Sequence, residues 1–339
     1  MEKDLQQRAA ENVLGIVRDV FEHDVSHRAI VVFDEGCALS QVLVEAYKSA
    51  LPAAEHILFD ELRATEIVES LMALESGDLV VLIQSGSFRL NEFRIRVELF
   101  KKGLKVIEHP HLARMDTDET VGIYVDSLHY DKDYYRGVGS KLKAKVDSAK
   151  EIVVESPGCE LRYEGPFEDA KLNVGDYSGM KNWGGMFPIG EVFTEPKNLE
   201  NVNGSVKLHA FGDRHFFTNI PPEPIEIIVE HGVVVDTRNS TPEFDAVLEE
   251  VREEIAILRE LGLSLNRAFT KERTVPDIGT YERKCGVHFS LGGKHAIYAK
   301  EGFSRKHSKF HVDVFADVTR VLIDGTVVFE NGQWLKEAL

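Results

Sequence analysis

The 339-residue sequence predicts two domains: an α/β domain with a mostly parallel sheet over residues 1–150, and an α+β domain with an antiparallel sheet over residues 151–339. Two observations lead to this prediction. In the first part, helical segments alternate with nearly continuous apolar runs, which is typical of parallel strands covered on both faces. From about residue 150 the apolar runs become short and are interrupted by Gly and Pro, which favours antiparallel hairpins.

The first domain is expected to alternate helices and strands. Its expected helices cover residues 5–21, 39–50, 64–74, 93–102 and 130–149, and its expected strands cover residues 29–34, 56–60, 78–84 and 104–107. No Gly-x-Gly-x-x-Gly follows any of these strands, and Gly137-Val138-Gly139 lies inside an expected helix. A dinucleotide-binding domain is therefore disfavoured, and we interpret this half as a scaffold.

The second domain is expected to contain mostly short strands. They cover residues 152–155, 160–163, 205–208, 225–230 and 233–235, and a hairpin over residues 321–332 turns at Asp324-Gly325. One long helix is expected over residues 242–261, where apolar side chains recur at helical spacing. Ser240 or Thr241 can cap its start, and Gly262 can end it.

The composition limits the possible functions. A hydrophobic content of 43% with 29% charged residues is typical of a soluble globular protein, and no apolar run approaches the roughly 20 residues of a membrane span. The N-terminus is expected to form an amphipathic helix and not a signal peptide. Cys37, Cys159 and Cys285 form no Cys-x-x-Cys pair and fit a reducing cytoplasm. The formal net charge of −17 argues against nucleic acid or an anionic membrane as partner.

Two expected strands near the C-terminus each combine an apolar face with a polar face. In the stretch from Val287 to Leu291 the apolar side chains alternate with His288 and Ser290, and in the stretch from Phe310 to Val314 they alternate with His311 and Asp313. The His-x-Asp pair places a nitrogen and an oxygen donor on one side of a strand, about 6.5–7 Å apart at the Cα atoms. Zinc, cobalt, manganese and iron accept both donors. His288, His311 and Asp313 are therefore predicted to bind a metal; the alternative is a polar strand edge that faces solvent.

Two acidic residues are further candidates. Glu260 is expected in the last turn of the long helix, where it faces the negative end of the helix dipole, a mismatch of up to about 1 kcal/mol that a cation would relieve. Glu191 follows Gly190 at the start of an expected strand. Each has a simpler interpretation: Glu260 is a solvated side chain among the neighbouring glutamates, and Glu191 is part of a loop that leads into a strand.

Four motifs in this order resemble the thermophilic metallo-aminopeptidases of the aminopeptidase T and aminopeptidase S group. The motifs are Gly190-Glu191-Val192-Phe193-Thr194-x-Pro196, Glu260-Leu261-Gly262, Gly286-x-His288-x-x-x-Gly292 and Ser308-x-x-His311-x-Asp313. The resemblance covers about residues 182–332, while the first half fits that group only in its α/β character. It implies a hydrolase that removes the N-terminal residue of a small peptide or peptide-like substrate, and it implies a homodimer.

By this resemblance, two divalent metal ions (zinc, cobalt, manganese or magnesium) are held by a set of five ligands. The ligands are Glu191, Glu260, His288, His311 and Asp313. Two metal ions roughly 3.5–4 Å apart activate a shared water and polarise the scissile carbonyl, and three carboxylates suit their charge. The same resemblance assigns a catalytic role to Glu191.

One position departs from that family. The family has a tyrosine seven residues after the histidine that matches His288, and this chain has His295 there. The tyrosine is expected to donate a hydrogen bond to the developing oxyanion. His295 is therefore a candidate catalytic residue, either as a hydrogen-bond donor or as an extra ligand, and Tyr298 lies three residues beyond it.

A rival interpretation comes from the 2,5-dihydroxypyridine ring-cleaving dioxygenases, which look similar around the His-x-Asp motif. There His288, His311 and Asp313 would form a two-histidine, one-carboxylate triad for a single Fe(II). That group has a histidine where this chain has Glu260, and it lacks the carboxylate that matches Glu191. A biosynthetic or non-catalytic relative of the aminopeptidases is a further alternative.

Overall fold

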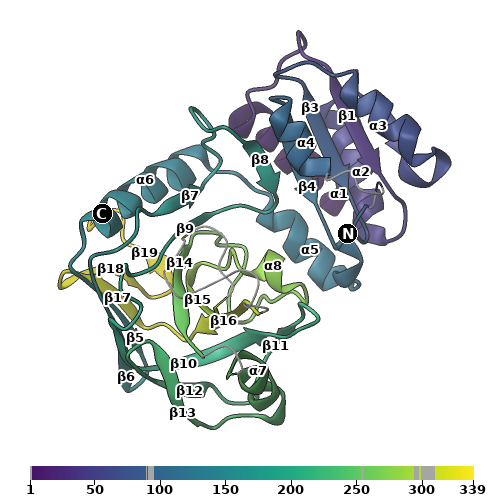
Figure 1. Cartoon of the computed structure of the whole chain (residues 1–339). Coiled ribbons are helices and arrows are strands. Elements are labelled where there is room, and N and C mark those ends of the chain that lie inside the picture. The colour runs from purple at the N-terminus through teal and green to yellow at the C-terminus, as the bar shows by residue number, and fades with distance from the viewer. Residues whose placement is uncertain (1, 89, 91–94, 253–255, 294–297, 299–309) are drawn as a thin grey trace. The chain divides into compact units, whose positions relative to one another are not determined.

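The computed structural model describes residues 2–88, 90, 95–252, 256–293, 298 and 310–339, which form two compact units (Figure 1). The first unit comprises Met1–Tyr135, Gly175–Ile189 and Arg273–Val275, and the second comprises Arg136–Val174, Gly190–Glu272 and Pro276–Leu339. This division differs from the expected boundary at residue 150 in two ways. Most of the helix before residue 150 belongs to the second unit, and residues 175–189 and 273–275 return to the first.

The described strands of the first unit form a five-stranded parallel sheet in the order β2-β1-β3-β4-β8. They are β1 (Ala29–Phe33), β2 (Glu55–Leu58), β3 (Leu79–Ile83), β4 (Lys105–His109) and β8 (Trp183–Met186). Every residue of β1 and β3 is buried, as expected for central strands covered on both faces. The parallel α/β architecture agrees with the prediction, whereas β8 was not expected.

Helices cover both faces of this sheet. They are α1 (Glu2–Gly15), α2 (Ala38–Ala50), α3 (Ala64–Met72), α4 (Ile95–Lys101) and α5 (Asp118–Ser127), with a π turn at Ile16–Val20 and 3₁₀ turns at Phe59–Glu61 and Leu112–Arg114. Side chains of α3 and α4 pack with Ile30, Val32 and Val80 of the sheet in one buried cluster. The α1 helix contacts α2 and α5, and α2 also contacts β1 and β3. Strand alternation therefore assigns the two helix groups to opposite faces.

A buried hydrogen-bond network connects these elements around His109, the last residue of β4. Tyr47 Oη lies 2.8 Å from His109 Nε2, and Tyr124 Oη lies 2.8 Å from His109 Nδ1. Tyr124 also donates to the carbonyl of Phe187 at 3.1 Å. Because that bond uses the Tyr124 proton, His109 donates through Nδ1 and accepts the Tyr47 proton at Nε2. This network gives hydrogen-bond partners to three polar side chains inside the core.

The second unit is built on a curled antiparallel sheet of 14 described strands (Figure 1). Its main path runs β19-β18-β17-β5-β6-β10-β16-β15-β14-β9-β7, and β11, β12 and β13 extend it beside β10. The strands are β5 (Glu151–Ser156), β6 (Cys159–Glu164), β7 (Lys171–Asn173), β9 (Glu191–Thr194), β10 (Val202–Gly212), β11 (Thr218–Asn219), β12 (Ile225–Glu230), β13 (Val233–Arg238), β14 (Leu258–Ser264), β15 (Gly286–Leu291), β16 (Val312–Ala316), β17 (Arg320–Ile323), β18 (Thr326–Glu330) and β19 (Gln333–Trp334). Three described helices accompany it, α6 (Lys132–Ser148), α7 (Pro242–Arg252) and α8 (Ile278–Tyr281).

The prediction of one long helix over residues 242–261 is wrong in its second half. The described part of α7 ends at Arg252, and Leu258–Ser264 forms β14, a strand in which every residue is buried. Leu258 continues the helical spacing of α7 by coincidence, and a short apolar run does not distinguish a buried strand from a helix. This segment is a strand because its backbone pairs with β9 on one side and with β15 on the other. Glu260 therefore faces no helix dipole, and Gly262 ends no helix.

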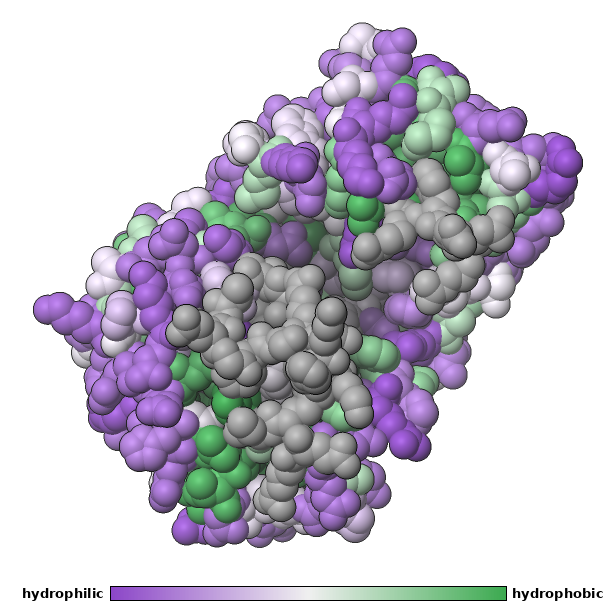
Figure 2. Space-filling model, viewed as in Figure 1, coloured by the Kyte–Doolittle hydropathy of each residue, from purple (hydrophilic) through white to green (hydrophobic). Residues whose placement is uncertain are grey.

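The surface drawn in Figure 2 is as polar as the 29% of charged residues in the sequence would suggest. The face drawn in Figure 2 is mostly hydrophilic, with hydrophobic residues in smaller patches between the polar ones. Among the described residues, no helix combines the length and the apolar character that crossing a membrane requires.

Candidate metal centre

Three neighbouring strands of the second unit carry the centre of the candidate site. Glu191 begins β9, Glu260 lies in β14 and His288 lies in β15, and β14 pairs with both other strands. Gly262 of β14 lies opposite His288. Side chains two residues apart on a strand share a face, so Glu260 points to the same face as His288. Ser264 lies opposite Glu191 on that face.

An extra residue in β14 shapes the site at Glu260. Between the pairs Leu258–Leu291 and Leu261–Phe289, β14 has one residue more than β15. Such β-bulges turn side chains toward functional sites. The amide of Glu260 leaves the regular ladder and donates to Ser290 Oγ at 3.1 Å.

The neighbouring Arg259 makes a fully buried ion pair with Glu195. Arg259 Nε and Nη2 donate to the two Glu195 oxygens at 3.1 and 3.0 Å, and both side chains are at most 1% exposed. Arg259 also donates to the carbonyls of Gly293 and Tyr298 at 2.7 and 3.2 Å. One guanidinium thus fixes β9, β14 and the end of β15 relative to one another beside the site.

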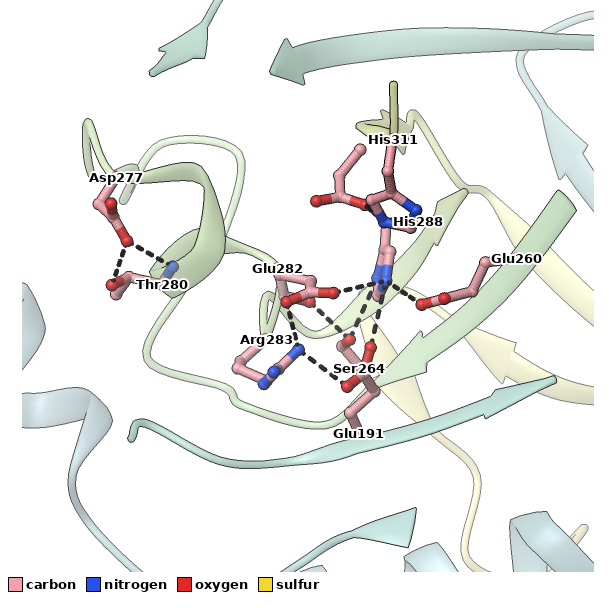
Figure 3. A network of polar contacts seen from close by, with 10 residues as sticks. Glu191, Glu260, Ser264, Asp277, Thr280, Glu282, Arg283, His288 and His311 are labelled. Atoms are coloured by element: carbon pink, nitrogen blue, oxygen red, sulfur yellow. Dashed lines mark hydrogen bonds and ion pairs between the residues drawn. The ribbon is translucent and has the colours of Figure 1, made fainter. Parts of the chain in front are cut away.

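Three carboxylates converge on one nitrogen atom. His288 Nε2 lies 3.2 Å from Glu191 Oε1, 3.5 Å from Glu260 Oε1 and 3.8 Å from Glu282 Oε1. One ligand atom from each of these four residues lies within 4.8 Å of every other. Figure 3 shows His288 at the centre of the cluster, with Glu260 on one side and Glu282 on the other. The His288 side chain is 1% exposed.

Glu282 was not predicted from the sequence. It follows α8, a one-turn helix capped by Asp277, whose carboxylate accepts from the Thr280 amide and hydroxyl, both at 2.8 Å (Figure 3). Because Glu282 belongs to no periodic element, strand or helix patterns could not assign it to the site. Its place six residues before His288 is the signal that was available.

Arg283 partly compensates the carboxylates. Its Nη1 lies 2.8 Å from Glu191 Oε2 and 2.7 Å from Glu282 Oε2. Burial would lower the pKa of Arg283, but the acidic neighbours, led by Glu191 and Glu282, raise it above its ordinary value. The guanidinium is therefore a permanent positive charge that holds one oxygen of each carboxylate.

The orientation of His288 leaves one ring nitrogen for a ligand. Ser264 Oγ donates to the carbonyl of Glu282 at 2.7 Å and lies 3.3 Å from His288 Nδ1. With its proton used, Ser264 accepts from Nδ1, so Nε2 is the nitrogen that faces the carboxylates and that can bind a cation once it loses its proton. Within the described part of the chain, His288 Nε2 and Glu191 Oε1 are buried and have no hydrogen bond of acceptable geometry. These two atoms are suited to bind a cation.

Gly262 leaves room for the imidazole. A Cβ atom at this position would lie 2.0 Å from His288 Cε1 and 2.2 Å from Nε2. Any side chain would displace the ring, so glycine is required here by close approach and not by a helix end.

His311 and Asp313 lie beside this cluster. His311 directly precedes β16, and its Nε2 lies 3.0 Å from Asp313 Oδ1. Figure 3 shows His311 next to His288. Burial would lower the pKa of His311, but Asp313, with smaller contributions from Glu260 and Glu282, raises it to about 9. The structure thus groups Glu191, Glu260 and His288 of the predicted ligands with Glu282, whereas His311 and Asp313 form a pair outside that group.

The charges of the metal-free site are strongly coupled. For His288, burial would lower the pKa, but hydrogen-bonding and charge effects of Glu191 and Glu260 raise it to about 10. Burial raises the pKa of Glu282 to about 8, with Glu191 and Asp313 adding to burial and Arg283 opposing it. Protons thus take the place of a cation, and metal binding is expected to release them.

The remaining catalytic candidate is not described by the structure. His295 lies outside the described residues, so its predicted role is untested. Tyr298 is described and buried, and its hydroxyl donates to the carbonyl of Asp169 at 2.8 Å. The Tyr298 proton is therefore engaged by the backbone in this arrangement.

Comparisons with known proteins support the fold alone. No protein-family model matches the sequence, and no curated protein matches it. Among solved structures, wild-type AmpT from Thermus thermophilus is similar, with a TM-score of 0.59 and 16% sequence identity. The match covers 98% of this chain and 99% of that chain. The two proteins therefore share their architecture over essentially the whole length.

Proposed function

We propose that this protein is a metal-dependent hydrolase that removes the N-terminal residue, or cleaves another amide bond, of a peptide-like substrate. The observation that carries the proposal is the convergence of Glu191, Glu260 and Glu282 on the buried Nε2 of His288. The motif resemblance to metallo-aminopeptidases and the fold shared with AmpT, an aminopeptidase, support the same conclusion.

The donor set fits divalent cations. With neutral imidazoles, four carboxylates (Glu191, Glu260, Glu282 and Asp313) face one fixed positive charge on Arg283. Three negative charges remain, which is costly in a buried site. One or two divalent cations bring the site within one charge of neutrality. Zinc, cobalt, manganese and magnesium are the proposed ions, with His311 completing the ligand set.

When bound, the metal ions supply Lewis acidity toward the scissile carbonyl and lower the pKa of water. The protein's own groups orient the reactants. We assign a catalytic role to Glu191, because Arg283 holds its Oε2 while its Oε1 faces His288 Nε2, where it would hold a metal ion and orient the reacting water. With one divalent cation bound, one negative charge remains at the site and attracts the α-ammonium group of a peptide, which favours substrates with a free N-terminus.

Other parts of this proposal rest on the resemblance or on composition. His295 is proposed to donate a hydrogen bond to the oxyanion, and the protein is proposed to be a cytoplasmic homodimer. Analytical ultracentrifugation of the purified protein tests the dimer.

The decisive experiment combines metal counting with an assay under air and under argon. The substrates are a short peptide and the same peptide with an acetylated N-terminus. We expect bound divalent metal, cleavage of the free peptide in both atmospheres and little cleavage of the acetylated one. One iron per chain with oxygen consumption would instead support the ring-cleaving alternative. Protein without metal or turnover would support a non-catalytic relative.

A further inference from the structure

A pocket of about 390 Å³ lies in the first unit, at the end of the sheet where its strands begin. Its lining includes His27, which precedes β1, Gly77, which precedes β3, and Lys181, which precedes β8. Lys105 and Trp183, the first residues of β4 and β8, complete its edge. All of these residues belong to the first unit, so this pocket is separate from the candidate metal centre.

Lys105 is the least exposed of the basic residues that line this pocket. It is only 6% exposed, although lysine is rarely buried without a partner. Among the described residues its ammonium group has no hydrogen bond or ion pair; the Nζ atom lies 5.2 Å from the centre of the Trp183 ring. Parallel pairing of β4 with β8 places Lys105 opposite Trp183, which explains this contact. The stem of Lys105 is thus buried, and its ammonium group, with three donors, is accessible from the pocket.

Asp78, an acidic residue at the same strand ends, forms no ion pair with this lysine among the described residues. Asp78 accepts from the amides of Arg28 and Glu75, both at 2.8 Å, so its two oxygens are occupied by the backbone. No carboxylate lines the pocket within the described part of the chain, although the whole protein has 57 acidic and 40 basic residues. Asp24 and Glu22 act on Lys105 only through longer-range attraction, while burial lowers its pKa.

The other lining groups indicate the shape of a ligand. Lys181 adds a second ammonium, and His27 adds a ring that is 38% exposed. Met180 and Trp183 supply apolar surface. Two cations beside apolar walls are suited to an oxyanion joined to a small apolar body, and the volume is in the range of small-molecule sites.

We propose that this pocket binds a small organic anion, whose carboxylate or phosphate group contacts Lys105 and Lys181 and whose apolar part packs on Met180 and Trp183. The proposal concerns binding alone and does not depend on hydrolysis at the metal centre.

Tryptophan fluorescence of the full-length protein tests this proposal. The chain has two tryptophans, and Trp183 lies in the pocket. Phenyl phosphate, 3-phenylpropionate and inorganic phosphate are titrated separately, with benzyl alcohol as the neutral probe. We expect a saturable change in emission with both organic anions, weaker binding of inorganic phosphate, and no saturation with benzyl alcohol.

Lysine variants assign the site. Lys105→Met is expected to weaken binding of the organic anions by about tenfold or more, since it removes a charge-assisted hydrogen bond. Lys48→Met, at a surface lysine paired with Glu45 in the same unit, is the matched control and is expected to bind as the wild type does. If circular dichroism shows that Lys105→Met does not fold, the Lys181→Met variant, at an exposed position, tests the proposal in its place. We expect it to weaken binding of the organic anions severalfold. Absence of saturation at millimolar anion, or equal binding by the lysine variants and the control, would overturn the proposal.

Discussion

Nε2 of His288 is the atom around which the candidate metal centre is arranged. It is buried, its ring is held by Ser264 through Nδ1, and it faces carboxylates from three separate segments. Hydrogen-bonding the far nitrogen of a ligating histidine fixes its tautomer and orientation, as in many metal sites. A strand edge facing solvent, the alternative for this histidine, is excluded by its burial.

Loss of a candidate ligand is expected to remove metal. His288→Ala and Glu282→Gln should each lower metal affinity and turnover by more than about 10–100-fold, because outer partners of metal sites alone contribute that much. Metal per chain and peptide cleavage are measured together. Glu249→Gln on the exposed side of α7 makes the same charge change as Glu282→Gln and should alter neither. Retention of metal by both site variants would show that the cluster is not a metal centre.

His109 predicts a separate dependence of stability on pH. Burial lowers its pKa from 6.5 to about 3, so the folded protein holds it neutral. The unfolded chain takes up a proton at this residue below about pH 6.5. The unfolded state then binds more protons, and the free energy of unfolding falls from pH 6.5 toward pH 3, by up to about 1.4 kcal/mol per pH unit from this group.

Urea unfolding of wild type and His109→Gln at several acidic pH values measures this contribution. The variant is expected to be less stable at neutral pH, because Tyr47 and Tyr124 lose a buried partner. Its stability should also fall less steeply with acid than that of the wild type. Parallel curves for the two proteins would mean that His109 does not contribute to acid sensitivity.

At the scale of elements, the packing of β14 against β15 depends on Gly262. Gly262→Ala places a methyl group 2.0 Å from the His288 ring, and neither neighbouring backbone can move without disturbing the sheet. We expect a loss of about 1–3 kcal/mol in the free energy of unfolding, typical of overpacking, together with reduced metal content. Chemical denaturation and metal analysis check both effects.

Gly137→Ala is the matched control for this substitution. Gly137 lies in α6 of the same unit, and a Cβ atom there meets nothing within 4 Å. Alanine is favoured over glycine in helices, so the control should be neutral or more stable by up to about 1 kcal/mol. Full metal content in Gly262→Ala would show that the His288 ring can be accommodated elsewhere.

The sequence predicts those helices and strands whose apolar residues recur at regular spacing. Long apolar runs identified β1 and β3, and the alternation around His288 correctly indicated β15. The fifth strand of the first sheet could not be recognised, because Trp183–Met186 contains two glycines and no apolar run. Its pairing with β4 is a tertiary effect.

The candidate site follows the same rule. His311 and Asp313 could be placed by their alternation with buried neighbours, whereas Glu282 could not, because it follows a single capped turn. Glu260 was predicted as a ligand at the end of a helix, but it lies in the strand β14. All seven residues of β14 are buried, and Leu258, the first of them, continues the apolar spacing of the helix before it. Local patterns therefore locate ligands on regular strands and miss those that depend on packing between segments.

At the scale of the whole molecule, the proposed ligands come from separate segments of the second unit only. Glu191, Glu260 and His288 lie on different strands, Glu282 follows α8, and His311 precedes β16. A bound metal therefore links parts of that unit that are distant in sequence and stabilises its folded state. The first unit holds none of these residues.

This division predicts that chelation destabilises one unit selectively. Metal at 1,000 times its Kd stabilises the folded state by about 4 kcal/mol, which corresponds to about 8–16 °C in the melting temperature of a unit of this size. The two tryptophans report on the units separately, because Trp183 lies in the first and Trp334 in the second. Trp183→Phe and Trp334→Phe each leave one reporter. With chelator, we expect the melting followed by Trp334 to move down by that amount and the melting followed by Trp183 to stay in place. Equal shifts in both variants, or no shift with metal verified absent, would contradict a metal centre confined to the second unit.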